Sequence, residues 1–316
     1  MLAVVYDGTQ LQVSERSVPE LRDGEALVRP TLVGICNTDL EILRGYANFS
    51  GILGHEFVGV VERCTDPAFA GQRVVGEINI TCGKCDMCRI GRREHCLRRS
   101  ALGIRGRDGA LAEYVALPVT NLHLVPRSVP DDAAVFAEPL AAACKILEQV
   151  HVHPLSRVVV LGDGKLGLLV AQVLALTGAD LIVAGRHEDK LAILSRRGIA
   201  TTAGDPLYYS GADLVVECTG RAEGFHTALE LVRPGGTLVL KSTYHGQIQA
   251  DLSRLVVDEI TVVGSRCGPF ATALRYLEMG LVEVVPLIAA RYRLADAAEA
   301  FHHAALPGTL KVLVHP

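Results

Sequence analysis

The sequence predicts an α/β protein in which a doubly wound parallel sheet is joined to a β-rich domain. Three observations predict it. Strand-like and helix-like segments alternate between residues 155 and 267, a glycine-rich turn follows the first of these strands, and four cysteines crowd into residues 82–96. A chain of 316 residues is long enough for two domains, and its apolar fraction of 49% suits large buried cores.

The first 130 residues have the pattern of a β-rich domain. Short apolar runs at residues 26–33, 57–62, 73–76 and 111–117 are separated by Gly, Pro and Asp turn signals, as expected of strands. The period then changes at residues 131–150, where apolar side chains recur at helical spacing behind Asp131, which can cap a helix. We therefore expect one helix over residues 131–150.

From residue 155 to residue 267, segments with the pattern of strands alternate with segments that have the pattern of helices. We expect strands at residues 158–161, 181–184, 200–202, 214–217, 237–240 and 260–263, and helices at residues 166–177, 188–197 and 222–232. Six strands with intervening helices predict a parallel, doubly wound sheet. The last fifty residues predict helices at 270–279 and 294–305 and a closing strand at 311–314.

Composition excludes several classes of partner. A formal charge of −4 argues against a dedicated nucleic-acid or membrane surface. The most apolar region, residues 158–184, is interrupted by polar side chains, and no charged leader precedes an apolar stretch, so we expect no membrane span. Nine cysteines without a long-loop cross-link pattern fit a reducing cytoplasm.

Four cysteines follow the spacing C-x2-C-x2-C-x7-C: Cys82, Cys85, Cys88 and Cys96. Four thiolates this close in sequence can surround one tetrahedral Zn²⁺, and a site without an open position is structural. Reduced surface thiols or two disulfides are the alternatives. A DNA-binding finger is disfavoured because no His pair follows at finger spacing.

The cofactor motif is a G-x-G-x-x-G turn between the expected strand 158–161 and an apolar helix. Gly162 permits the tight turn, Gly164 lets a pyrophosphate approach the backbone, and Gly167 lets the helix and strand pack closely. The helix that opens at Lys165 and Leu166 directs its N-terminus at the phosphates. A flexible surface turn is the alternative to dinucleotide binding.

The choice between NAD and NADP depends on the end of the second strand of this sheet. Asp180 lies at the wrong end of that strand to bind ribose hydroxyls. Gly185, Arg186 and His187 follow the strand instead, and a glycine leaves room for a 2′-phosphate that Arg186 can hold. We therefore favour NADP(H) over NAD(H). Arg186 could also stack on the adenine, in which case NAD is accepted.

A second metal site is indicated by ligand-type residues in three separated segments. They are Cys36, His55 with the adjacent Glu56, and Glu138. Taken singly, each has an ordinary explanation as a small core residue, a hydrogen-bonded imidazole or an acid in the first turn of a helix. Together, one thiolate, one imidazole and one carboxylate supply a catalytic zinc with an open position for substrate.

These features resemble the zinc-dependent medium-chain dehydrogenase/reductase superfamily, in its polyol and alcohol dehydrogenase branch. The resemblance covers the whole chain and is carried by residues 34–39, 54–59, 82–96, 138–140, 162–167 and 217–220. It implies a GroES-like β-barrel catalytic domain over residues 1–150, a Rossmann domain over residues 151–267 and a C-terminal segment, 268–316, that returns to the catalytic domain. It also implies a homodimer or homotetramer.

The resemblance implies roles for individual residues. Cys36 and His55 would be fixed zinc ligands, Glu138 would bind directly or through water, and Glu56 would enter the shell transiently. Thr38 matches the hydroxyl that relays the substrate proton. Glu41 stands where relatives often have His, so the proton could leave through Glu41, through ribose and water, or by another route.

Further contacts are expected around the two sites. Thr219, Ser242 and Ser265 follow strands of the parallel sheet at the edge where cofactors bind, although ordinary loop polarity is the alternative. Candidate substrate-pocket residues, each of which could equally be a core residue, are Phe49, Leu53, Leu140, Tyr244 and Cys267.

The expected function is reversible hydride transfer between an alcohol (a secondary alcohol, polyol or sugar) and NADP(H), with one catalytic and one structural zinc per chain. An NAD(H)-specific polyol dehydrogenase is the nearest alternative. A zinc-free enoyl or quinone reductase of the same fold is disfavoured, because it would need neither the set Cys36, His55 and Glu138 nor the cysteines of residues 82–96. A non-enzymatic NADPH-binding redox sensor or structural protein is the alternative from another class.

Overall fold

The computed structural model describes residues 1–243 and 247–316, which form two compact units. Unit 1 contains Met1–Glu138, Ala273–Glu278 and Leu287–Pro316, and unit 2 contains Pro139–Thr272 and Met279–Pro286. The boundary at residue 138 precedes the one expected at residue 150, and it falls inside helix α4 (Ala137–Gln149). Residues 279–286 belong to unit 2 because Gln172 exchanges two hydrogen bonds, of 2.9 and 2.8 Å, with the backbone of Glu283.

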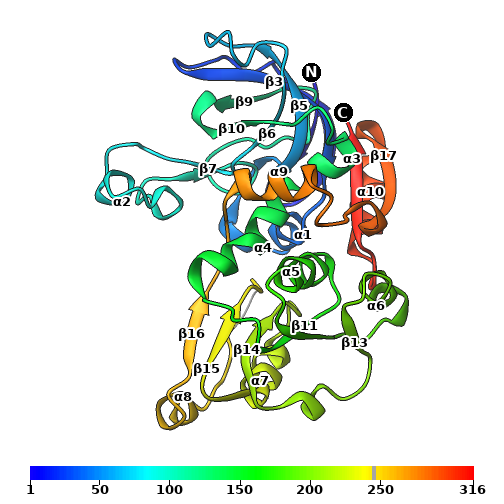
Figure 1. Cartoon of the computed structure of the whole chain (residues 1–316). Helices are drawn as coiled ribbons and strands as arrows, with labels where there is room; N and C mark the ends of the chain where they lie inside the picture. The colour runs from blue at the N-terminus through cyan, green and yellow to red at the C-terminus, as the bar shows by residue number, and fades with distance from the viewer. Residues whose placement is uncertain (244–246) are drawn as a thin grey trace. The chain divides into compact units, whose positions relative to one another are not determined.

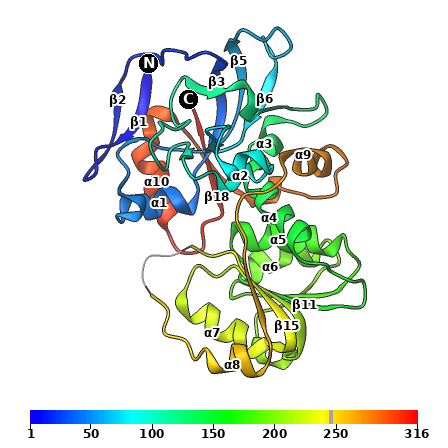
Figure 2. The same cartoon turned by 90° about the vertical axis from the view of Figure 1, so that its left-hand side faces the viewer.

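Unit 1 is built on a seven-stranded sheet of order β10-β6-β5-β3-β18-β17, with β9 paired to β3. Figure 2 shows β18 beside β3, with which it pairs antiparallel. The strands are β3 (Glu25–Gly34), β5 (Glu56–Arg63), β6 (Arg73–Gly76), β9 (Val115–Pro118), β10 (Leu122–Leu124), β17 (Ile288–Arg293) and β18 (Lys311–His315). Two smaller sheets contain β1 (Leu2–Tyr6), β2 (Leu11–Glu15) and β4 (Gly51–Ile52), and β7 (Asn79–Ile80) and β8 (Ser100–Ala101).

Most of the expected strands of unit 1 are confirmed to within a residue, but the run at 111–117 is only partly right. The strand there, β9, begins at Val115. Residues before it make a single isolated bridge, between Ala112 and Ala3, and the Leu111 N–H donates to the Leu53 carbonyl at 2.9 Å. Leu111 and Ala112 are therefore buried and hydrogen-bonded without belonging to a regular ladder.

The single helix expected over residues 131–150 is wrong. The structure has two helices, α3 (Asp131–Ala134) and α4 (Ala137–Gln149). Pro139 explains the break, because it lacks an N–H and its ring would clash with the carbonyl of Val135, four residues earlier. In the first turn of α4, where N–H groups have no helical partner, the same proline is tolerated. The break leaves Glu138 in that first turn.

Unit 2 is a six-stranded parallel sheet, as predicted, and its strand order is β13-β12-β11-β14-β15-β16. Figure 1 shows helix α5 over β11 and helix α7 against β14 and β15, as their contacts confirm. The strand order reverses at β11, which lies between β12 and β14, and ligands bind at such reversals. The strands are β11 (Arg157–Leu161), β12 (Asp180–Ala184), β13 (Ala200–Thr202), β14 (Ala212–Glu217), β15 (Val232–Leu240) and β16 (Thr261–Gly264).

The helices expected between these strands are confirmed as α5 (Lys165–Ala175), α6 (Glu188–Ser195) and α7 (Ala222–Leu231). Near the C-terminus, α9 (Phe270–Glu278) and α10 (Ala297–Ala305) match the expectation. Three short helices were not expected: α1 (Asn37–Leu43), α2 (Asp86–Arg89) and α8 (Ser253–Val257). Within the described ranges, no helix combines the length and apolarity that a membrane crossing requires.

Candidate catalytic and cofactor sites

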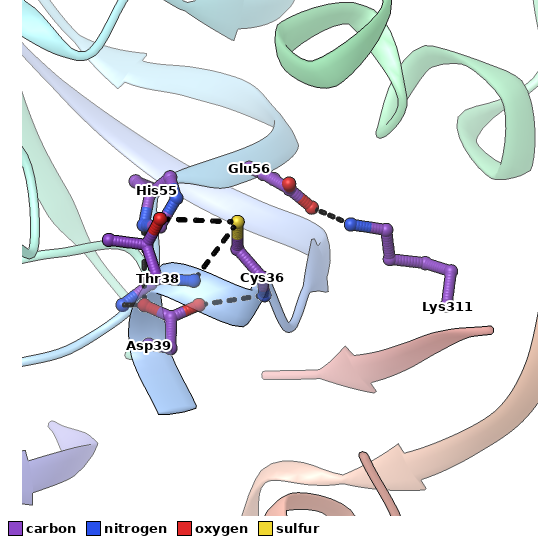
Figure 3. A network of polar contacts seen from close by, with 7 residues as sticks. Cys36, Thr38, Asp39, His55, Glu56 and Lys311 are labelled. Carbon is purple, nitrogen blue, oxygen red and sulfur yellow. Dashed lines mark hydrogen bonds and ion pairs between the residues drawn. The ribbon is translucent and has the colours of Figure 1, made fainter. Parts of the chain in front are cut away.

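Cys36 is held at the junction of β3 and α1, where it is the residue before the helix. Its Sγ lies 3.5 Å from the N–H of Thr38, and its own N–H donates to Asp39 Oδ2 at 2.8 Å. This reciprocal pattern caps the helix and fixes the direction of the thiol (Figure 3). The Thr38 hydroxyl lies 3.7 Å from the same sulfur.

His55 lies against a fully buried carboxylate. Asp39 Oδ1 is 3.2 Å from His55 Nδ1 and accepts the Gly54 N–H at 3.3 Å. Burial disfavours charge on His55, but the neighbouring Asp39 and Cys36 raise its pKa well above the usual value. A carboxylate behind an imidazole is the arrangement that orients metal-binding histidines. Asp39 was not predicted to have a role, although it lies within the motif at residues 34–39.

Glu56 forms a buried ion pair with Lys311, the first residue of β18 (Figure 3). Both residues are at most 2% exposed, and the ammonium lies 5.8 Å from the centre of the Phe136 ring. Burial opposes charge on Lys311, but Glu56 and Cys36 raise its pKa. A role for Lys311 was not predicted, because no local pattern in the sequence relates β18 to Glu56.

The ligand atoms of Cys36, His55 and Glu56 all lie within 4.8 Å of one another. Glu138 is not a member of this group, although its charge acts on Lys311. One sulfur, one imidazole nitrogen and one carboxylate oxygen are the donors that zinc prefers, so the residues fit a catalytic zinc. The structure thus brings together three of the four ligand candidates from distant segments.

Other candidates around this site are placed as follows. Glu41 pairs with Arg44 at 2.6 Å along α1. Phe49, Leu53 and Leu140 are buried core residues, at 7%, 0% and 0% exposure, and Cys267 is half-buried. Tyr244 lies outside the described residues. The pocket assignments therefore remain predictions.

The four cysteines of residues 82–96 form a single cluster around α2. Their sulfurs lie within 4.8 Å of one another, and three of the pairs are separated by 3.5, 3.8 and 3.5 Å. Four thiolates on a tetrahedral zinc would be about 3.8 Å apart, given Zn–S bonds of about 2.3 Å. Backbone hydrogen bonds from Cys88 and Leu97 lower the pKa of Cys85 to about 6, whereas burial and the neighbouring Cys85 thiol raise the pKa of Cys88 to about 11. The cluster therefore fits a structural zinc and contains no disulfide.

The glycine turn has the geometry that its motif requires. Gly162 has a φ of +112°, in the region that favours glycine. An added Cβ at Gly164 would meet nothing within 4 Å, whereas one at Gly167 would lie 2.0 Å from the Gly162 carbonyl oxygen. Helix α5 begins at Lys165 and no side chain caps it, so its first N–H groups can receive phosphate.

The segment after β12 is fixed by Asp163, for which no role was predicted. Asp163 Oδ2 accepts the N–H groups of Arg186 and His187, each at 2.7 Å, and lies 2.9 Å from His187 Nδ1. Gly185 precedes these residues, and Arg186 is exposed. The turn at residues 185–187 is therefore tied to the glycine turn at residues 162–167.

The three strand-end residues belong to local networks. Thr219 donates from its N–H and its hydroxyl to Glu217 at 2.6 and 2.5 Å. Ser242 accepts the Gly220 N–H at 2.8 Å. Ser265 is buried, and its hydroxyl accepts a hydrogen bond of 3.2 Å from the Lys241 ammonium in the interior of the protein. Their contact with a cofactor remains a prediction.

Family models match most of both units. Residues 22–127 match the alcohol dehydrogenase GroES-like domain, and residues 166–279 match the zinc-binding dehydrogenase model. An L-threonine 3-dehydrogenase from Streptomyces avermitilis is 35% identical over 318 residues, covering 91% of this chain and 90% of that protein. Further relatives are named for D-xylulose, erythritol, L-threitol and D-arabinitol.

Solved structures agree along the whole chain. One from Sinorhizobium meliloti 1021, bound to NADP, has a TM-score of 0.91 at 30% identity and covers 100% of this chain and 99% of its own. An alcohol dehydrogenase from Escherichia coli CFT073 in complex with NADH has a TM-score of 0.91 at 26% identity, with the same coverage. The expected GroES-like and Rossmann-type folds are thereby confirmed.

Proposed function

This chain belongs to the zinc-containing medium-chain dehydrogenase/reductases, and from that premise we propose that it transfers hydride reversibly between a secondary alcohol, polyol or sugar and NADP(H). The broad activity, oxidation of CH–OH groups with a nicotinamide cofactor, is the activity of the family. The substrate class and the cofactor preference are the finer parts of the proposal.

One observation carries the assignment of zinc chemistry to unit 1. Cys36, His55 and Glu56 come from the start of α1 and from the segment entering β5, yet their ligand atoms converge within 4.8 Å. We infer that Cys36 and His55 are permanent ligands. Glu56 and Glu138 are the two carboxylates that could complete the shell. Zinc bound there supplies Lewis-acid chemistry that lowers the pKa of a substrate hydroxyl.

The chain's own residues then have defined tasks. Asp39 holds the imidazole of His55 and the backbone of Cys36 in place. Thr38 is positioned, with its Oγ1 3.7 Å from the Cys36 sulfur, to take the substrate proton. Lys311 holds the carboxylate of Glu56 and offsets the negative charge of the ligand set. The hydride is accepted by the nicotinamide, whose redox chemistry belongs to the cofactor.

The preference for NADP(H) rests on the segment after β12. Residue 185 is a glycine, whereas NAD enzymes place an acid there to bind ribose hydroxyls. Arg186 is exposed beside it, and a guanidinium can hold a phosphate with two parallel hydrogen bonds. The two similar structures hold one cofactor each, NADP and NADH, so an NAD(H)-specific polyol dehydrogenase is the alternative to test.

Steady-state rates with a panel of secondary alcohols, polyols and sugars test this function. We expect two zinc ions per chain by elemental analysis and a kcat/KM for NADP⁺ at least about tenfold above that for NAD⁺, the effect of one charge-assisted pair. A higher kcat/KM with NAD⁺ would establish the alternative cofactor. One zinc per chain and no turnover would instead favour a non-enzymatic NADPH-binding protein.

The assembly we propose is a homodimer or homotetramer formed through β16. In the described part of the sheet, this strand is the last in the order and pairs with β15. Val262 on it is 40% exposed, and Val256 and Val257 of α8 are 76% and 79% exposed. A sheet edge of this kind is a template for pairing. Light scattering of Val262→Lys should show a smaller species than the unmodified chain.

We further place the protein in the cytoplasm, where the four thiolates of residues 82–96 stay reduced.

A further inference from the structure

Asp163 joins two turns that both belong to the cofactor side of unit 2. It follows Gly162 in the glycine turn, and its Oδ2 receives the N–H groups of Arg186 and His187 at 2.7 Å each. The His187 ring adds a third contact, 2.9 Å from its Nδ1 to the same oxygen. A single carboxylate oxygen therefore holds the turn at residues 185–187 at three points.

The same side chain dictates that residue 185 is glycine. A Cβ added to Gly185 would lie 2.6 Å from Asp163 Cβ and 2.7 Å from Oδ2, closer than real Cβ atoms approach. The φ of Gly185 lies outside the left-handed region, so the requirement is one of space and not of backbone conformation. Any side chain at residue 185 must displace Asp163.

The charge of Asp163 is satisfied within the protein. Its side chain is 11% exposed. Burial opposes ionisation, but the hydrogen bonds from His187 and Arg186 outweigh it and lower the pKa of Asp163. The ammonium of Lys190 lies 3.4 Å from His187 Nδ1, which brings a cation to the same turn. The carboxylate is thus ionised and bonded to the turn, and it leaves the positive charge of Arg186 available to a ligand.

We propose that Asp163 is the positioning residue for cofactor selection: it presents Arg186 to a 2′-phosphate and excludes from residue 185 the acid that would bind a ribose diol. This inference rests on the proposed preference for NADP(H) and traces it to a residue outside the strand end where selectivity is usually read. It has a specific consequence. Gly185→Asp alone would place two carboxylates in overlapping space, so it cannot create an NAD site while Asp163 is present.

Calorimetric titration of the zinc-loaded, full-length protein tests the inference without turnover. The probes are 2′,5′-ADP, which carries the 2′-phosphate, and ADP, which lacks it. Asp163→Ala should weaken the binding of 2′,5′-ADP about tenfold, because the charge-assisted hydrogen bonds that shape the site are lost. It should weaken the binding of ADP less than about twofold. Asp163→Asn, which keeps the size of the side chain, should show the same direction with a smaller change.

Asp213 offers a matched control in the same unit. It also accepts a backbone N–H, from Arg157 at 2.7 Å, and an arginine side chain, Arg233, at 2.6 Å, but it lies near the start of β14 instead of its cofactor end. Asp213→Ala should leave the ratio of the two affinities unchanged. If it shifts that ratio as much as Asp163→Ala does, or if Asp163→Ala weakens both probes equally, the inference is overturned.

The pairing of residues 163 and 185 is tested by combining substitutions. Gly185→Asp should lose measurable binding of both ADP and 2′,5′-ADP. Asp163→Ala/Gly185→Asp should recover an ADP affinity within about threefold of that of the unmodified chain, while its affinity for 2′,5′-ADP stays low. A gain of ADP preference by Gly185→Asp alone contradicts the inference. An unmodified protein that binds ADP as tightly as 2′,5′-ADP overturns the NADP(H) assignment and the inference with it. An affinity ratio of 2′,5′-ADP to ADP that Asp163→Ala leaves unchanged overturns the inference alone.

Discussion

Lys311 and Glu56 form an ion pair in the interior of unit 1, although 255 residues separate them in the chain. Glu56 is 1% exposed and lies with Cys36 and His55, so the ammonium of Lys311 is a direct neighbour of the proposed zinc site. Neither charge can be hydrated where it lies, so each depends on the other. Lys311 therefore links the last strand of the sheet to the ligand set.

Replacing Lys311 with Met should destabilise unit 1 by about 3–5 kcal/mol, because Glu56 is left buried without its counter-ion. Urea unfolding followed by circular dichroism measures this loss. Glu56→Gln/Lys311→Met removes both charges and should recover most of it. Arg275→Met breaks an exposed pair with Glu278, and it should cost less than about 1 kcal/mol. Equal losses for Lys311→Met and Arg275→Met would show that the buried pair has no special weight.

Replacing Cys36 with Ser should remove the catalytic zinc and spare cofactor binding. We expect elemental analysis to give one zinc per chain and turnover to fall at least about 100-fold, because the Lewis acid is lost. NADPH binding, followed by fluorescence, should not change. Cys64→Ser is the control, since that thiol donates to the Asp66 carbonyl and lies outside both metal clusters. Full activity in Cys36→Ser with a single zinc would disprove the proposed mechanism.

Asp39→Asn should weaken the catalytic zinc by about 10- to 100-fold, the usual effect of removing the carboxylate behind a metal-binding imidazole. Competition with a chromophoric chelator measures that affinity. Asp7→Asn, which changes a carboxylate in an exposed turn, should leave the zinc affinity unchanged. An unchanged affinity in Asp39→Asn would mean that Asp39 acts only as a cap for α1.

Cys88→Ser should empty the structural zinc site. The segment from Cys82 to Cys96 has one buried cysteine, Cys96, and exposed apolar residues such as Ile90, so the metal is its main organiser. We expect the melting temperature to fall by about 3 °C or more and proteolysis to begin within residues 82–96. Titration with NADPH should be unaffected. Unchanged melting and proteolysis would show that the segment holds its shape without metal.

The pH dependence of stability should reveal how much the ionised carboxylate of Asp163 contributes to the free energy of unfolding. Burial opposes its ionisation, but hydrogen bonds from His187 and Arg186 lower its pKa in the folded state. Its contribution is therefore complete above the unfolded pKa of about 4 and is lost as the pH falls through the lower folded value. Chemical unfolding at pH 6 and at successively lower pH should show a smaller loss for Asp163→Asn than for the unmodified chain. Parallel curves would contradict this assignment.

The sequence predicted the features that local patterns encode. The strand at residues 158–161, the glycine turn after it and the cysteine spacing of residues 82–96 each carry their signal within a few residues. Helix α1 was missed because it is short and mostly polar, and the break before α4 was missed although Pro139 marks it. The catalytic zinc ligands were nominated because Cys36, His55 and Glu138 together offer a thiolate, an imidazole and a carboxylate, and the resemblance to a known family then gave each its role.

What the sequence could not predict are contacts between distant residues. Nothing near Glu56 indicates that Lys311 will face it, and nothing near Gly185 indicates that Asp163 occupies the space of its missing side chain. In each pair, a charged residue (Lys311 or Asp163) lies against a residue of a segment for which a site was predicted. The segment predicts which ligand binds, and the distant charged residue explains the local geometry.

Strand β18 lies inside the seven-stranded sheet, between β3 and β17, and not at its rim. Residues 311–315 are synthesised after every other strand of their sheet and after the stretch Pro139–Thr272, which makes up most of unit 2 and can fold earlier. Until β18 arrives, Val33 and Gly34 of β3 lack their partners in that strand, and Glu56 has no counter-charge. Unit 1 therefore cannot complete this sheet or neutralise Glu56 before residues 311–315 have been synthesised.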